Sequence, residues 1–174
     1  MARSALSSKQ GAFKGGAVSA ASYIPAATVV AASALSLLPI VSVTGWWPNA
    51  GFLMLIAWRL LRIDPWPAWW AAPLGFINDL LTGAPIGLSV TLWSAVMLAM
   101  EFVDSRTQWR DYWVEWAIAT ILITADCWFD WQIAGLMGAP VPFLHIVPAI
   151  VLSMFAFPIA AMIVARLDRW RFGR

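Results

Sequence analysis

Six long apolar stretches follow one another along the chain with short polar gaps between them, and this pattern limits the possible folds more than any other feature. Backbone polar groups in the hydrocarbon must be satisfied within a helix or a closed barrel, and continuous apolar runs without alternation favour helices over a barrel. We therefore predict an all-α, polytopic integral membrane protein with about six transmembrane helices. The stretches cover residues 23–43, 47–61, 66–81, 86–103, 112–136 and 141–165.

The composition agrees with this class. Of the 174 residues, 61% are hydrophobic and 11% are charged, whereas a soluble domain carries about 25% charged residues. The second and third stretches are short and reach only about 24 Å as helices. The two either span a thinned region of the bilayer, or one of them is re-entrant.

The basic residues predict the orientation. They fall in the N-terminal tail, in the gaps after the second and fourth stretches, and in the C-terminal tail, while the gaps around TGWWP, TGAPI and MGAPVP contain none. With six spans the four basic regions share one side, so the positive-inside rule places both termini in the cytoplasm. The eleven residues are Arg3, Lys9, Lys14, Arg59, Arg62, Arg106, Arg110, Arg166, Arg169, Arg171 and Arg174.

The predicted domain organisation is simple. Residues 1–21, rich in Ser, Ala and Gly, are expected to form a disordered cytoplasmic tail, residues 22–166 the helical bundle, and residues 167–174 a basic cytoplasmic tail. Most of the 13 Trp lie near the expected span ends, as in an interfacial aromatic belt. Trp93, Trp128 and Trp131 lie deeper and are candidates for helix packing or for a partner surface.

Several classes of function are disfavoured by the sequence. It contains no P-loop, no GxSxG and no HExxH motif, so no common catalytic motif indicates an enzyme. Cys127 and His145 are the only residues of their types and cannot build a metal cage, and no cofactor is predicted. The basic residues follow the membrane topology, which argues against a nucleic-acid surface.

Acidic residues inside the apolar stretches are costly and therefore suggest function. Asp126 and Asp130 are four residues apart and share a helix face, while Glu115 lies near the other end of the same stretch. One hypothesis is a proton or cation path that joins this pair with Asp79 and His145. The favoured alternative is a set of water-accessible acids near the outer surface that contact helix ends and partner proteins.

The segment GFINDLLTGAPIG, residues 75–87, predicts a helical hairpin. A Gly just past the end of a helix, followed by a Pro, is a typical helix stop. Gly83 and Pro85 therefore predict that the third helix ends near Thr82 and that a tight turn follows. We expect Pro85 at the start of the fourth helix, where its missing N–H is not needed.

Asp79 lies in the last turn of the third predicted helix, where a negative charge opposes the helix dipole. The nearest compensating donors are the free backbone N–H groups at residues 86–89, which begin the next helix. We therefore expect the Asp79 carboxylate to accept hydrogen bonds across the turn, as an N-cap does, and to tie the two helices together. Gly75, on the same face, would let a neighbouring helix come close.

The whole segment resembles the signature region of the MreD family of rod-shape-determining membrane proteins. The preceding PNAGFLMLIAW, residues 48–58, looks like the second span of that family, whereas the long N-terminal tail departs from its pattern. The residues that match the signature are Gly75, Asp79, Leu80, Gly83, Ile86 and Gly87. The candidates for structural or partner contacts are Gly75, Asn78, Asp79, Gly83, Pro85, Gly87, Asp126 and Asp130.

The resemblance implies a non-enzymatic scaffold of the cell-wall elongation machinery in the bacterial inner membrane. Such a protein binds MreC, a single-span membrane protein, and helps maintain cell shape by organising peptidoglycan synthesis. It works with the RodA glycosyltransferase, a class B penicillin-binding protein and, indirectly, MreB filaments. MreD-like proteins are also similar in fold to the S-components of ECF vitamin transporters.

That likeness supplies an alternative function, a membrane protein that holds a small ligand on its outer side. The scaffold predicts exposed apolar strips for a partner helix and no closed polar pocket. The alternative predicts an outward pocket with several polar groups, and small residues on the first span. The first stretch does contain Ala26, Ala27, Ala31, Ala32 and Ala34.

Overall fold

The computed structural model describes residues 17–38, 47–61, 67–104, 112–138 and 142–171, and every regular element in these ranges is a helix. The predicted all-α class is therefore confirmed for the described residues, with six α-helices. They are α1 (Ala17–Ser33), α3 (Ala50–Leu61), α4 (Ala71–Thr82), α5 (Leu88–Asp104), α6 (Tyr112–Leu136) and α7 (Val147–Arg171). Three short 3-10 helices accompany them: η1 (Ala34–Leu37), η2 (Ala68–Trp70) and η3 (Phe143–His145).

Helix α6 has the predicted bounds, but α1 and α7 do not. Helix α1 begins at Ala17, inside the tail expected to be disordered, because Ala-rich sequence favours the helix. Its 3-10 extension ends at Leu37, and the predicted end at residue 43 lies outside the described residues. Helix α7 continues past residue 165 to Arg171, where the Arg169 side chain donates from Nε to the Ala165 carbonyl at 3.3 Å.

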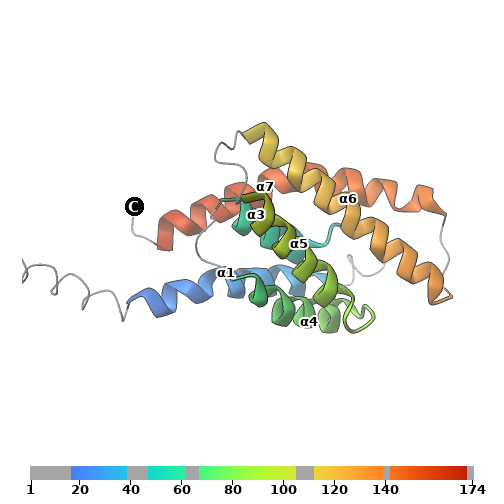
Figure 1. Ribbon diagram of the computed structural model, residues 1–174, viewed down its shortest axis with the longest axis horizontal. Helices are drawn as coiled ribbons and strands as arrows, with labels where there is room; N and C mark the ends of the chain where they lie inside the picture. The colour runs from blue at the N-terminus through green and yellow to red at the C-terminus, as the bar shows by residue number, and fades with distance from the viewer. Residues whose placement is uncertain (1–16, 39–46, 62–66, 105–111, 139–141, 172–174) are drawn as a thin grey trace, which may run out of the picture.

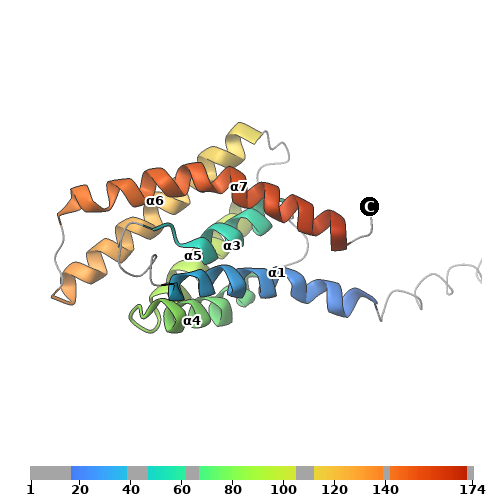
Figure 2. The ribbon, with the colours of Figure 1, turned by 180° about the vertical axis from the view of Figure 1, so that it is seen from behind.

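Consecutive helices run in opposite directions, so the first residue of α1 and the last of α7 lie at the same end of the bundle, on the left in Figure 1. Helices α1 and α4 form one side of the bundle, and α6 and α7 cross on the other. Helix α5 runs diagonally over the front and packs most closely on α4. The view from behind shows α3 between α1 and α7, and it contacts both (Figure 2).

Helix α3 is the centre of the core. All its residues from Gly51 to Leu60 are buried, as expected for a helix that is apolar on every side. The Phe52 ring stacks on Trp93 from α5 with their centroids 6.0 Å apart, and Trp58 donates from Nε1 to Thr28 Oγ1 at 2.9 Å. Trp93 is thus a packing residue. Twelve residues give α3 a length of only about 18 Å.

Arg59 departs from the topology drawn from the sequence. The positive-inside pattern assigns it to the basic gap after the second stretch, but the structure places it in the last turn of α3 with 3% of its surface exposed. A cation at this position is favourable with the helix dipole. The misassignment arises because a charge pattern carries no information on which helices enclose α3.

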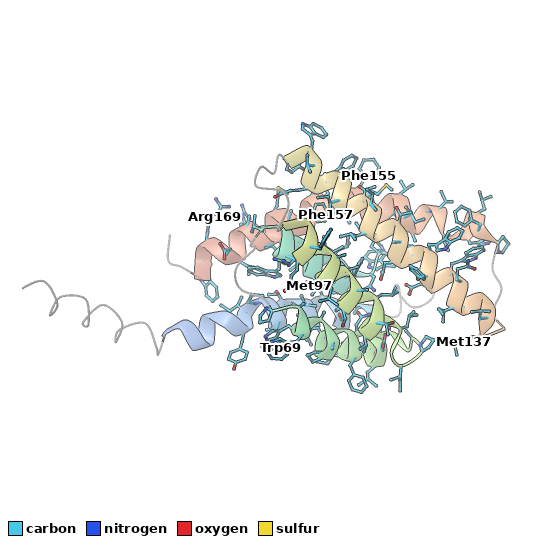
Figure 3. All side chains as sticks on the ribbon, in the orientation of Figure 1. Trp69, Met97, Met137, Phe155, Phe157 and Arg169 are labelled. Atoms are coloured by element: carbon cyan, nitrogen blue, oxygen red, sulfur yellow. The ribbon has the colours of Figure 1, made fainter. Side chains whose placement is uncertain are left out.

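Large apolar side chains cover much of the outer surface. In Figure 3, Phe155 and Trp69 lie on the outside of the bundle, whereas Phe157 and Met97 belong to the core. Among the described residues, one helical stretch, Phe143–Trp170, is both long and apolar enough to cross a membrane. The shorter helical stretches Tyr23–Leu37, Ala50–Leu61 and Leu88–Phe102 are also apolar.

Candidate functional site

The α4–α5 turn has the predicted helix stop. Helix α4 ends at Thr82, and Gly83 takes the left-handed conformation with φ of 70°. Pro85, however, lies in the turn and does not begin the next helix, so that part of the prediction is wrong. Gly87 has φ of 101°, which is not helical, and α5 can therefore begin only at Leu88. The Leu88 N–H donates to the Pro85 carbonyl at 3.1 Å.

Asp79 makes the hydrogen bonds that the sequence predicts. Its Oδ2 accepts from the Gly87 backbone N–H at 2.8 Å, and its Oδ1 accepts from the Ser89 N–H at 2.9 Å. Gly87 immediately precedes α5 and Ser89 is its second residue, and backbone N–H groups at the start of a helix have no acceptor within that helix. The carboxylate is only 1% exposed and caps α5 from the neighbouring helix. The predicted tie between the two helices is confirmed.

Gly75 allows the close packing of this hairpin. A Cβ atom at this position would lie 2.6 Å from the Ser89 carbonyl oxygen and 2.8 Å from the Val90 Cα. Both are backbone atoms, which cannot rotate away as a side chain can. The absence of a side chain at Gly75 therefore sets the α4–α5 distance, as the sequence predicts.

Asn78 and Ser33 bring two buried polar atoms to one place. The Asn78 amide is 1% exposed and donates from Nδ2 to Ser89 Oγ at 3.0 Å, but its Oδ1 has no hydrogen-bond partner among the described residues. The Ser33 hydroxyl on α1 is buried and likewise unpartnered. A Cβ on Gly51 would meet both Ser33 Oγ and Asn78 Oδ1. Gly51 thus lets α1 and α4 converge on α3.

Ser33 and Asn78 are among the residues that line a cavity of about 420 Å³, here called the polar pocket. It lies between η1, the start of α3, the α4–α5 turn and the C-terminal part of α6. This is the end of the bundle opposite the first residue of α1 and the last of α7 (Figure 1). Its volume is in the range of small-ligand sites. The polar residues that line it include Ser33, Ser36, Asn49, Asn78, Ser89 and Asp130.

The acidic residues singled out from the sequence do not meet in this pocket. Asp130 lines it, whereas Asp126, one turn earlier on α6, is buried and is not part of the lining. Both Asp79 oxygens accept backbone hydrogen bonds, and His145 lies exposed in η3. Of the four groups in the hypothetical proton path, only Asp130 lines the pocket. Among the described residues, no cluster of three or more His, Cys, Asp or Glu could hold a metal ion.

The sequence reasoning missed Ser33, Asn49 and Gly51. Asn49 carries a recognisable signal, because an Asn directly before an apolar helix is a typical N-cap. Its Oδ1 does accept from the Phe52 N–H, at 3.2 Å. Ser33 and Gly51 have no such local signal, since each matters only through residues from other helices.

A second cavity, of about 530 Å³, lies beside the polar pocket between α1, α3 and α7; we call it the apolar groove. Thr28 is the only polar residue among the described residues that line it. The two cavities share a wall. The residues common to both linings are Ala32, Leu35, Trp47, Pro48 and Ala50.

Comparisons of the chain with models of protein families, with curated proteins and with solved structures found no match in any of the three.

Proposed function

We propose that this protein is a membrane-embedded scaffold of the bacterial cell-wall elongation machinery, related to MreD, and that the apolar groove receives the single transmembrane helix of MreC. The proposal rests on the resemblance of residues 48–87 to that family and on the groove. Both termini are then cytoplasmic, and the polar pocket faces the outer side of the inner membrane.

The groove is the observation that carries this proposal. Its walls present small side chains from two helices, Ala31 on α1 and the pair Ala156 and Ala160 on α7. Ala156 and Ala160 are four residues apart, so they share one face of α7. Small residues on facing walls let a helix backbone approach closely, which is how helices associate in a bilayer without a hydrophobic driving force.

The signature residues also fit a structural role. Gly75 sets the helix distance, Asp79 caps α5, and Gly83 and Gly87 provide the left-handed turn conformations. The three glycines and Asp79 all shape the hairpin, and none of them presents a reactive group at the surface. The signature residues of the family thus determine the shape of the hairpin and not a chemical reaction, as expected of a scaffold.

Filling the groove tests the proposal. Ala31→Trp places a large side chain in the groove from an exposed position on α1, so the core is not disturbed. We expect the recovery of MreC with the protein from membranes, measured by mass spectrometry, to fall at least tenfold. The matched control is Ala99→Trp, at an exposed position on α5 outside the groove, which should leave recovery unchanged.

Thermal unfolding in detergent should be the same for the two variants and the unmodified chain. Equal MreC recovery with Ala31→Trp and Ala99→Trp would show that MreC does not bind in the apolar groove. Recovery of a transport ATPase module in place of the elongation proteins would overturn the scaffold itself.

A second function is favoured by the polar pocket. An outward pocket with several polar groups is what the alternative, a membrane protein that holds a small ligand, predicts, whereas the scaffold predicts no closed polar pocket. The small residues expected on the first span are also present, since Ala31 and Ala32 line the groove beside the pocket. We therefore propose ligand binding at this pocket as the second candidate function.

A further inference from the structure

We propose that the polar pocket binds a primary ammonium group, supplied either by a lipid headgroup or by a free amine. This inference rests on the second candidate function and names the class of its ligand. Its basis is the set of hydrogen-bond acceptors that the pocket leaves unused.

Charge is the first constraint on the ligand. Asp130 is the only charged side chain among the described residues that line the pocket. A carboxylate accepts hydrogen bonds and attracts a cation, and it repels a phosphate or a carboxylate ligand. With no Lys or Arg in the described lining to balance it, the pocket favours a positively charged group.

Two hydroxyl groups of the lining, those of Ser36 and Thr82, add to this preference because their protons are already engaged, whereas the unpartnered Ser33 hydroxyl can either donate or accept. Ser36 Oγ donates to the Ser33 carbonyl at 2.7 Å, and Thr82 Oγ1 donates to the Asn78 carbonyl at 2.8 Å. These two hydroxyl oxygens therefore have only lone pairs to offer a ligand.

The orphaned Asn78 Oδ1 is one more acceptor. Its amide nitrogen is engaged with Ser89, and the oxygen is buried without a partner among the described residues. An unsatisfied buried acceptor destabilises the protein, and a donor from the ligand would remove that cost. An ammonium has three donors and no acceptor, and so complements this set better than a hydroxyl or an amide.

Trp47 completes the site. It lines both the pocket and the groove and is half exposed. An indole ring attracts a cation placed over its face, and Trp is the strongest of the aromatic side chains in this respect. A cation between Trp47, which precedes α3, and Asp130 on α6 would contact both an aromatic ring and a carboxylate.

The shared wall of the two cavities allows two sources of the ammonium. A lipid such as phosphatidylethanolamine would place the ammonium end of its headgroup in the polar pocket and a chain along the apolar groove, where it would compete with a partner helix. A free amine would occupy the pocket alone. Both present the same group to Asp130 and Asn78.

Binding measurements on the full chain in maltoside detergent test the inference. We expect n-hexylamine to bind by calorimetry, and n-hexanol and hexanoate, with the same chain length, to bind at least tenfold more weakly. Asp130→Asn should lower the affinity for hexylamine at least tenfold. Because Asp130 is exposed, this variant should keep its thermal unfolding temperature. The control is Glu101→Gln, an exposed carboxylate on α5 outside the pocket, which should bind hexylamine as the unmodified chain does.

The lipid arm uses native mass spectrometry after reconstitution with phosphatidylethanolamine or phosphatidylglycerol. Retention of one phosphatidylethanolamine, lost in Asp130→Asn, identifies the lipid as the source, and displacement of hexylamine by ethanolamine alone identifies a free amine. Equal binding of hexylamine and hexanol, or unchanged affinity in Asp130→Asn, would show that the ligand class is wrong. If no probe binds and no small molecule copurifies, the second candidate function fails as well.

Discussion

Two turns in this protein share the sequence Gly-Ala-Pro, at residues 83–85 and 138–140. In both, the glycine follows the end of a helix and takes a left-handed conformation, with φ of 70° at Gly83 and 86° at Gly138. The last two residues of the second turn, Ala139 and Pro140, lie outside the described part of the chain. Gly83 directly follows Thr82, the last residue of α4, whereas Met137 separates Gly138 from Leu136, the last residue of α6.

The helices that precede the two turns differ. Four residues before Gly83 is Asp79, which caps the next helix, whereas four residues before Gly138 is Ala134, which has no acceptor in its side chain. Eight residues before Gly83 is Gly75, where the hairpin packs most closely; the corresponding residue of the second hairpin is Asp130, which lines the polar pocket. The turn sequence ends a helix, but the residues one and two turns earlier decide how the next helix packs.

Removing the cap should have the largest effect. Asp79→Leu leaves the buried N–H groups of Gly87 and Ser89 without their acceptor, and each such loss costs about 1–3 kcal/mol. We expect a loss of about 3 kcal/mol in the free energy of unfolding, measured by thermal or denaturant unfolding in detergent. Asp79→Asn supplies one acceptor in place of two, so its loss should be intermediate. Glu101→Leu, at an exposed carboxylate, is the control, and an equal loss in both leucine variants would refute the cap.

Adding a side chain at Gly75, where α4 contacts α5, should have the next largest effect on the free energy of unfolding. Gly75→Ala forces a methyl group against the backbone of α5 and should destabilise the protein by about 2 kcal/mol, as overpacking does. Gly135→Ala, in α6 where a Cβ would meet nothing within 4 Å, should instead stabilise it by about 0.5–1 kcal/mol. Opposite signs in the same unfolding assay are the expected outcome; equal signs would mean that α4 and α5 pack less closely than the structure shows.

The turn glycines themselves should have the smallest effect. A Cβ at Gly83 or Gly138 would have open space around it, so only the left-handed conformation opposes Ala. We expect Gly83→Ala and Gly138→Ala each to cost about 1 kcal/mol. The two values should agree within error in unfolding experiments. A much larger loss of unfolding free energy at Gly83 would show that the close packing of α4 and α5 also strains this turn.

The α4–α5 hairpin could be predicted from the sequence because its interacting residues are close along the chain. Asp79 and its two donors lie within ten residues, and the Gly-Pro stop gives their relative position. The six helices could be predicted for a similar reason, since each apolar run is a local pattern. The position of Pro85 was missed because the left-handed φ of Gly87, which delays the start of α5, leaves no mark in an apolar segment.

The polar pocket could not be predicted in this way. Ser33, Asn78 and Asp130 come from three different helices, and only the packing of α1, α4 and α6 around α3 brings them to one cavity. The burial of Arg59 was missed for the same reason. Hydropathy and charge patterns describe each helix alone, and neither specifies which helices are neighbours.

The enclosure of α3 has a consequence for how the chain is made. Synthesis runs from the N-terminus, so α3 leaves the ribosome second, while α7, which packs against it, leaves last. Until then one side of the innermost helix has no protein neighbour, so its apolar side chains have to be shielded in another way. We therefore expect a nascent chain that stops before Val147 to be unstable in the cell, even though it already contains five of the six α-helices that the structure describes.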